Sequence, residues 1–271
     1  MMKQYLEIKA RHPESILFFR MGDFYEMFLD DALIAARILD ITLTSRNKNS
    51  ADEIPFCGVP FHSAQPYIAR LVEAGHRVAI CEQVEDPKQA KGIVKRDVVK
   101  VVTPALVTES ESLTPDENSY LLALCQQDGR WGCAWLDLST GEFKASEEES
   151  LTGAAAMLAA IGPRELLLAE ALRKELPDEL GLLHGDRPRS GVADWVLDKD
   201  YCSGLICNRF GIASPDAFGM EGLPLALLAI GMVLHYLQEN RHAALPHLRD
   251  ISIVRRNDFL ALDPEIGRAH V

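Results

Sequence analysis

Three strand-like segments separated by short turn sequences constrain the fold of this chain more than any other feature. The segments are residues 120–126, 131–138 and 142–145, and the turns between them are Asp128-Gly129 and Ser139-Thr140-Gly141. Asp-Gly favours a two-residue hairpin turn, because both of its positions tolerate a positive φ. The sequence therefore predicts a three-stranded antiparallel meander.

Further strands and helices alternate on both sides of this meander. An Ala-rich helix at about 150–161 and a strand at 165–169 follow it, and the order β-β-β-α-β-α is that of a ribonuclease H-like sheet. Upstream, the apolar run 16–19 is typical of a buried strand, and residues 77–81 are predicted as a further strand, with helices between them. We therefore predict an α/β chain in which a mixed-sheet domain precedes a ribonuclease H-like domain.

A flat apolar ring and a carboxylate stand two residues apart at Phe24 and Glu26. Asp23 followed by Glu26 matches a capping box, so a helix is predicted over Phe24–Leu39. In one interpretation Glu26 only caps this helix, and the Phe24 ring packs inward. In the other, the ring enters between DNA bases and the carboxylate tests a base edge. Spacing alone favours the first interpretation.

The net charge of −12 argues against nucleic acid binding, but the charges are distributed unevenly. Residues 1–104 hold 14 Lys/Arg and 14 Asp/Glu, whereas residues 105–271 hold 14 and 26. The first part also contains a basic cluster, which is either a solvated face or an edge that tracks phosphates. Its members are Lys88, Lys91, Lys95, Arg96 and Lys100.

Enzyme-like motifs are sparse. The sequence has neither a phosphate-binding P-loop nor a dinucleotide-binding glycine pattern, and its histidines show no metal-ligand spacing. Asp137, which precedes the Ser139–Gly141 turn, could hold magnesium as in a nuclease. A plain hairpin turn is the favoured interpretation, because no further carboxylates converge there.

Two features of the sequence predict the cellular compartment of the chain. They are its cysteine pattern and the length of its apolar segments. Six cysteines are scattered without any Cys-x-x-Cys, which suits core thiols in a reducing cytoplasm. Charged residues interrupt the amino-terminal segment, so no signal peptide is predicted, and the longest apolar run is too short for a bilayer. We expect a cytoplasmic protein without a membrane partner.

A series of ordered motifs then identifies a resemblance. The series resembles the amino-terminal part of the bacterial MutS DNA mismatch-repair family, co-linearly over nearly the whole chain. Its blocks are Met21–Glu26, Leu39–Thr44, Ile54-Pro55, Gly58–His62, Ala79–Gln83, Val102–Pro104 and Leu245–Arg249.

The resemblance implies the domain organisation. Residues 1–104 would be the mismatch-recognition domain, 105–116 a linker and 117–250 the ribonuclease H-like connector domain. Residues 251–271 would be the truncated start of a core domain. The last six residues, 266–271, match the translation of a common sequencing adapter, so we expect an artefactual C-terminus.

The resemblance also implies a function in mismatched-DNA recognition. Phe24 would stack on a mispaired base from the minor groove, and Glu26 would hydrogen-bond that base. Other DNA-binding candidates are Met21 and the phosphate-contacting residues Arg46, Lys91, Lys95, Arg96 and Lys100.

Cofactors and partners follow from the same resemblance. The chain itself would be no enzyme and hold no cofactor, whereas ATP and magnesium would act in the longer parent, an ATP-dependent DNA clamp. Its partners would be mismatched double-stranded DNA, a second copy through missing domains, and a downstream repair protein through the connector. The alternatives are an interaction module only and a magnesium nuclease centred on Asp137.

Overall fold

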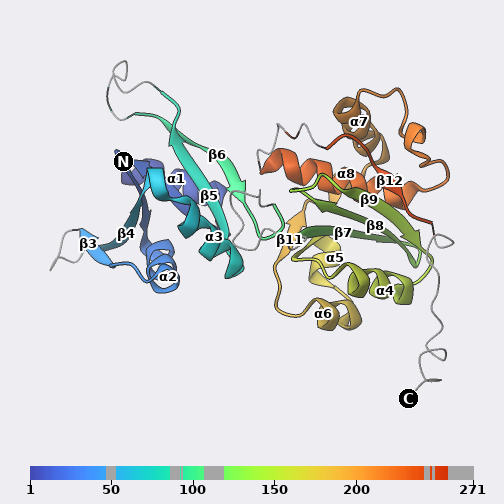
Figure 1. Cartoon of the computed structure of the whole chain (residues 1–271), viewed down its shortest axis with the longest axis horizontal. Coiled ribbons are helices and arrows are strands. Elements are labelled where there is room, and N and C mark those ends of the chain that lie inside the picture. Colours follow the sequence, from blue (N-terminus) through green and yellow to red (C-terminus); the bar gives the residue numbers. More distant parts are fainter. Residues whose placement is uncertain are drawn as a thin grey trace.

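The computed structural model describes residues 1–46, 53–85, 92, 94–106, 119–240, 245 and 248–255. They form two α/β parts that lie side by side (Figure 1). The elements of the first part are α1 (Met2–Arg11), β1 (Ser15–Met21), β2 (Phe24–Phe28), α2 (Leu29–Leu39), β3 (Thr44–Arg46), β4 (Ile54–Pro60), η1 (Phe61–Ser63), α3 (Gln65–Glu73), β5 (Arg77–Gln83) and β6 (Arg96–Val102).

The second part is larger. Its elements are β7 (Tyr120–Gln127), β8 (Arg130–Asp137), β9 (Phe143–Glu148), α4 (Leu151–Ile161), β10 (Glu165–Ala169), α5 (Glu170–Lys174), α6 (Asp178–His184), β11 (Arg189–Val192), η3 (Asp194–Leu197), α7 (Lys199–Phe210), η4 (Pro215–Phe218), α8 (Pro224–Glu239) and β12 (Ser252–Ile253).

Each part is built on one six-stranded sheet. The strands follow the order β3-β4-β2-β1-β5-β6 in the first sheet and β11-β10-β7-β8-β9-β12 in the second. In the first sheet β1 pairs antiparallel with β2 and parallel with β5, and in the second β7 pairs antiparallel with β8 and parallel with β10. The predicted α/β architecture with mixed sheets is therefore confirmed.

The helix predicted over Phe24–Leu39 is wrong in its first five residues, which form strand β2. Met21 and Phe24 are paired across a two-residue turn, in which Gly22 has a φ of +58°. Strand β2 places alternate side chains in the cores on the two faces of the sheet, which a helix at this position would not do. Glu26 lies within this strand, so the capping-box interpretation is overturned.

Different helices cover the two faces of the first sheet. Phe19 and Phe28 pack beneath α1, where both rings contact the ring of Tyr5 edge-on. On the opposite face, Tyr25 and Met27 lie in the core beneath α2 and α3. Burial decreases along β1 and β2 toward the turn that joins them, so the hairpin end projects from the core.

The meander predicted from the turn sequences is confirmed as β7, β8 and β9. Asp128 and Gly129 both have positive φ values, +52° and +78°, as a two-residue hairpin turn with this twist requires. The predicted helix and strand that follow are also present as α4 and β10.

Helices cover the second sheet on both faces, with α7 and α8 on one side and α4, α5 and α6 on the other (Figure 1). Helix α8 is buried along most of its length. No helix in the described part of the chain combines the length and apolar character that crossing a bilayer requires.

The segment after β6 enters the core of the second part. Ala105 and Leu106 are fully buried there, packed with residues of β7, β8 and α8. The first residues of the expected linker 105–116 are thus anchored, while residues 107–116 lie outside the described residues, as do residues 256–271.

Candidate nucleic-acid interface

Phe24 is an exposed aromatic residue at the tip of the β1–β2 hairpin. It is the first residue of β2 after the turn, and its side chain is 47% exposed. Met21, its partner on β1, lies on the same face of the sheet and packs against the core beneath α1. Because β1 and β2 are the two central strands, the Phe24 ring is presented by a well-supported part of the domain.

Contacts on the opposite face of the sheet hold this hairpin in place. The guanidinium of Arg20 lies 3.3 Å from the ring centroid of Phe61, and its Nε donates to the Gly22 carbonyl at 2.6 Å. The backbone N–H of Phe61 donates to the Asp23 carbonyl at 3.0 Å. Arg20 and Phe61 therefore fix the turn that positions Phe24, a role that sequence reasoning missed because it depends on the pairing of β2 with β4.

Glu26 forms an ion pair with Arg46. The two residues share a sheet face with Phe24, and Arg46 Nη2 lies 2.7 Å from Glu26 Oε2. Gly58 of β4 stands beside Glu26, and a Cβ added to Gly58 would lie 3.2 Å from the Tyr25 carbonyl oxygen and 3.6 Å from Glu26 Cγ. A larger residue at position 58 would therefore crowd the space next to the Glu26 side chain.

The guanidinium of Arg46 also rests against two aromatic rings. Its Cζ lies 5.2 Å from the ring centroid of Phe28 and 5.1 Å from that of Phe56. Such cation–π contacts orient a guanidinium without consuming its hydrogen-bond donors. Arg46 thus combines an ion pair with donors that remain available for another acceptor.

Two opposing effects set the protonation of Glu26. Partial burial raises the pKa of its carboxyl above the ordinary value of 4.5, and the positive charge of Arg46 works in the opposite direction. Burial is the larger of the two. The protonation state of Glu26 therefore depends on whether Arg46 stays beside it.

The described members of the basic cluster, Lys95, Arg96 and Lys100, lie in three different surroundings. Arg96 is buried, and its Cζ lies 5.1 Å from the centroid of the Phe19 ring. Its Nε donates to the Arg20 carbonyl at 2.6 Å, so the guanidinium makes its contacts inside the domain. Lys100 pairs with Ile80 on the opposite face from Phe24, whereas Lys95 is exposed. Lys88 and Lys91 lie outside the described residues.

Asp137 has the surroundings of a turn-stabilising residue. Its side chain is fully buried, and Oδ1 accepts hydrogen bonds from the Ser139 N–H at 2.8 Å and the Ser139 hydroxyl at 2.6 Å. Across the described ranges, no group of three or more His, Cys, Asp or Glu residues is placed to hold a metal ion. This geometry favours the hairpin-turn interpretation over the nuclease.

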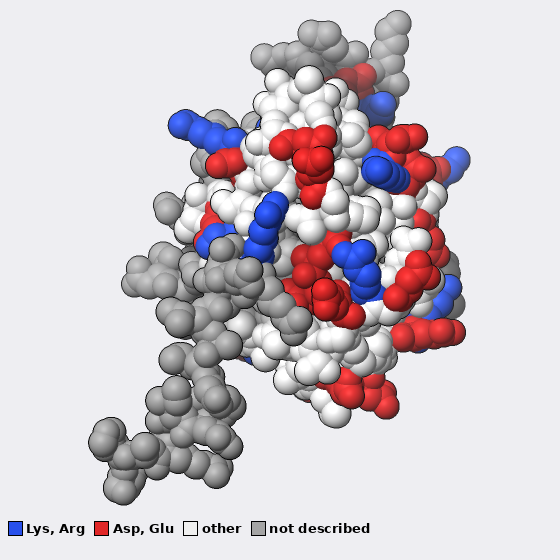
Figure 2. All heavy atoms as spheres, turned by 90° about the vertical axis from the view of Figure 1, so that its right-hand side faces the viewer, with Lys and Arg blue, Asp and Glu red and all other residues white. Residues whose placement is uncertain are grey.

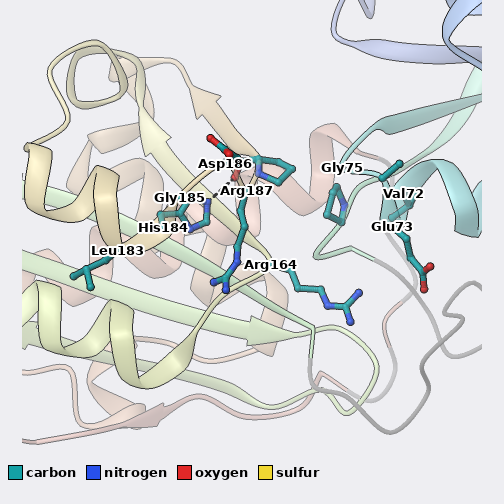
Figure 3. Close-up of a pocket in the computed structure, with 12 residues that line it drawn as sticks. Val72, Glu73, Gly75, Arg164, Leu183, His184, Gly185, Asp186 and Arg187 are labelled. Atoms are coloured by element: carbon teal, nitrogen blue, oxygen red, sulfur yellow. Dashed lines mark hydrogen bonds between the residues drawn. The ribbon is translucent and has the colours of Figure 1, made fainter. Parts of the chain in front are cut away.

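A cavity lies between the two parts, and Phe24 does not line it. It measures about 810 Å³ and is lined by the end of α3 and by the segment between α6 and β11 (Figure 3). Arg164 and Arg187 both line it, together with the acidic residues Glu73 and Asp186. None of the predicted DNA-binding residues in the described ranges contributes to its wall.

The second part presents an acidic face at the end opposite the first part. Among the described residues of this face, Asp and Glu cover more surface than Lys and Arg (Figure 2). Negative charge repels a phosphate backbone. The exposed Phe24 hairpin is therefore a better candidate for contact with nucleic acid than this face.

Comparison with known protein families gives two matches in succession. Residues 1–111 match the model of MutS domain I, and residues 119–249 match that of MutS domain II. Three curated relatives are each named DNA mismatch repair protein MutS. The one from Desulfatibacillum aliphaticivorans is 42% identical over 99% of this chain, and those from Syntrophobacter fumaroxidans and Myxococcus xanthus are each 43% identical, over 97% and 100% of it.

The chain spans 30% of the length of each of these relatives. The two domain matches follow each other in order and together cover most of the chain. The chain therefore belongs to the MutS family, whose domains I and II it carries.

Proposed function

We propose that this chain recognises mismatched DNA for a longer DNA mismatch-repair protein. The names of its relatives support this role, and the observation that carries the mechanism is the half-exposed Phe24 ring at the tip of a braced hairpin. The ring enters the duplex from the minor groove and stacks on a mispaired base.

The energy of wedge insertion explains how a mismatch is distinguished. Unstacking one base step, so that the ring can enter between two neighbouring base pairs, costs about a few kcal/mol in intact duplex. A mismatch has already lost part of its pairing and stacking, so the same insertion and kink cost less there. Stacking a base on the Phe24 ring returns about 1–3 kcal/mol whatever the base, so selectivity follows deformability rather than sequence.

Glu26 adds the second part of the recognition. On the same face as Phe24, its side chain hydrogen-bonds the base on which the ring stacks. As a carboxylate it is repelled by phosphates, which penalises binding to intact duplex. Exposed Lys95 and partly exposed Arg46 supply phosphate contacts that fix the register.

The longer protein would supply the remaining activities. ATP and magnesium act in domains beyond the two found here, as do the surfaces that join two copies into a clamp on DNA. The acidic second domain supports contact with other proteins rather than with DNA, and a downstream repair protein is its partner (Figure 2).

The proposal is tested by fluorescence anisotropy of the 271-residue chain with a G·T heteroduplex and with its fully paired control. We expect wild type to bind the heteroduplex more tightly, and Phe24→Ala to bind it about 5- to 150-fold more weakly, which corresponds to the stacking energy. The paired duplex should bind both proteins alike.

Trp195→Ala is the matched control, because Trp195 is another exposed aromatic residue but lies in the second domain. It should discriminate as well as wild type. If Phe24→Ala also discriminates as well as wild type, the wedge function is refuted.

A further inference from the structure

Two negatively charged groups can compete for the guanidinium of Arg46. Its guanidinium is paired with Glu26 at 2.7 Å, yet it belongs to the same sheet face as Phe24, where the proposed duplex binds. A nearby phosphate competes with the Glu26 carboxylate for this guanidinium. Binding of a duplex therefore tends to separate the pair.

The surroundings of the pair allow such an exchange. Arg46 ends β3, the edge strand, and its side chain is 35% exposed, whereas Glu26 belongs to central strand β2 and is 18% exposed. Besides Glu26, the guanidinium contacts two ring faces and the sulfur of Met1 at 3.6 Å, none of which fixes it by a strong hydrogen bond.

Among the described residues, Arg46 is the charged group that pairs with Glu26. Around the Glu26 side chain, β1 contributes Phe19, β4 contributes Gly58 and β3 contributes Arg46. Removing the guanidinium therefore leaves a mostly buried carboxylate whose other described neighbours are Phe19 and Gly58, and such a carboxylate takes up a proton more readily.

We propose that Arg46 is the positioning residue that controls the charge of Glu26, pairing with it in the free protein and releasing it to a phosphate when DNA binds. The released carboxylate takes one proton from solvent, and its new O–H donates to the base on which Phe24 stacks. This inference rests on the proposed mismatch recognition. If Glu26 is protonated in this way, the chain takes up one proton when it binds a mismatch.

The direction in which pH changes the affinity follows from the pKa of Glu26 in the free protein and in the DNA complex. Burial already raises the pKa of Glu26 in the free protein, and losing Arg46 raises the pKa further in the complex. The complex then binds more protons than the free protein. Between the two pKa values the affinity for mismatched duplex increases by about tenfold per pH unit of acidification, and the gain is complete below the lower value.

The first experiment needs no DNA. NMR titration of the Glu26 carboxyl carbon in the 271-residue chain measures its pKa in wild type, Arg46→Met and Arg46→Lys. We expect a higher pKa in Arg46→Met and a value near wild type in Arg46→Lys, which keeps the charge.

Arg11→Met is the matched control, because Arg11 pairs instead with Asp97 in the same domain. It should leave the Glu26 pKa unchanged. An unchanged Glu26 pKa in folded Arg46→Met would overturn the inference, whatever the DNA-binding result.

The second experiment measures the affinity for the G·T heteroduplex between about pH 5 and 8.5. We expect wild type to bind more tightly as the pH falls and Glu26→Gln to show no such dependence, because Gln donates without titrating. In Arg46→Met the pH dependence should weaken.

The outcomes separate the two proposals. A wild type that prefers the heteroduplex equally at every pH overturns the Arg46 inference and leaves mismatch recognition standing. A wild type that never prefers the heteroduplex refutes mismatch recognition, even if the first experiment shows that Arg46 controls the Glu26 charge.

Discussion

The Thr103 hydroxyl donates a hydrogen bond of 2.6 Å to Glu165 Oε2, which joins the end of the first domain to the sheet of the second. The N–H of Ala105 donates to the same oxygen at 3.1 Å. Oε1 accepts from the hydroxyls of Ser190 and Tyr236, both at 2.5 Å. One fully buried carboxylate thus gathers four donors, and all four come from residues at least 25 positions away in the sequence.

Replacing Glu165 by Gln should destabilise the second domain. The amide nitrogen of Gln cannot accept a hydrogen bond, so two of the four donors lose their partner, at a cost of about 1–3 kcal/mol each. Tyr236 cannot compensate by ionising, because burial, the largest cause that raises its pKa well above 10, is still present in the variant. Urea unfolding followed by tryptophan fluorescence measures the loss, since Trp131 and Trp135 are buried in β8.

Glu170→Gln is the matched control for this substitution. Its carboxylate is substantially exposed and pairs with Arg173 at 3.2 Å on the surface of α5, a kind of pair that contributes about 0–1 kcal/mol. If Glu165→Gln unfolds at the same urea concentration as Glu170→Gln, the carboxylate does not anchor the domain junction.

The sequence predicted the parts of the fold that local patterns determine. The β7–β9 meander follows from turn residues that lie directly between strand-like segments, and Asp128-Gly129 has the positive φ values expected of a two-residue hairpin turn. Strand β2 was missed because it is five residues long and continues into α2, and because Asp23 and Glu26 also match a helix cap. The alternation of its side chains between two faces indicates a strand only once β1 and β4 are known to lie on either side of it.

In the candidate site, too, the features set by local sequence were predicted and those set by strand pairing were not. Phe24 and Glu26 were identified from sequence, whereas the pairing of Glu26 with Arg46 was not, because β4 lies between their strands and comes later in the chain than both. The basic cluster looked continuous because Arg96 and Lys100 are four residues apart. In β6 they lie on opposite faces of the sheet, with an irregularity in the pairing between them.

Two glycines in the helices of the second domain should respond oppositely to Ala. A Cβ on Gly231 of α8 would lie 2.2 Å from Cys202 Sγ and 2.5 Å from its Cβ, so α7 and α8 would have to separate. Overpacking of this kind costs about 1–3 kcal/mol. Gly204 of α7 has no neighbouring atom within 4 Å of a Cβ, so Gly204→Ala should stabilise by about 0.5–1 kcal/mol through higher helix propensity.

Thermal unfolding of the two variants checks this prediction, with wild type as the reference. The melting temperature should decrease for Gly231→Ala and increase for Gly204→Ala. A Gly231→Ala protein as stable as wild type would mean that the close packing of α7 on α8 contributes little to stability.

His184 should make the second domain less stable in mild acid. Its ring is buried, and burial, the largest cause, lowers the pKa below 6.5, while Nε2 lies 3.0 Å from the Pro188 carbonyl oxygen. The neutral ring in the folded state donates this bond. As the pH falls below about 6.5 the unfolded chain gains a proton that the folded chain lacks, so stability present above that pH is progressively lost, by at most about 1.4 kcal/mol per pH unit.

His184→Gln isolates this contribution, since the Gln amide can donate to the Pro188 carbonyl but does not titrate. Urea unfolding at pH 7.5 and pH 5 should show a smaller loss of stability on acidification in His184→Gln than in wild type. His62→Gln, which changes an exposed histidine of the first domain, should retain the wild-type loss. Equal losses in wild type and His184→Gln would mean that the buried ring accepts a proton without unfolding, and that its environment between α6 and β11 is open to water.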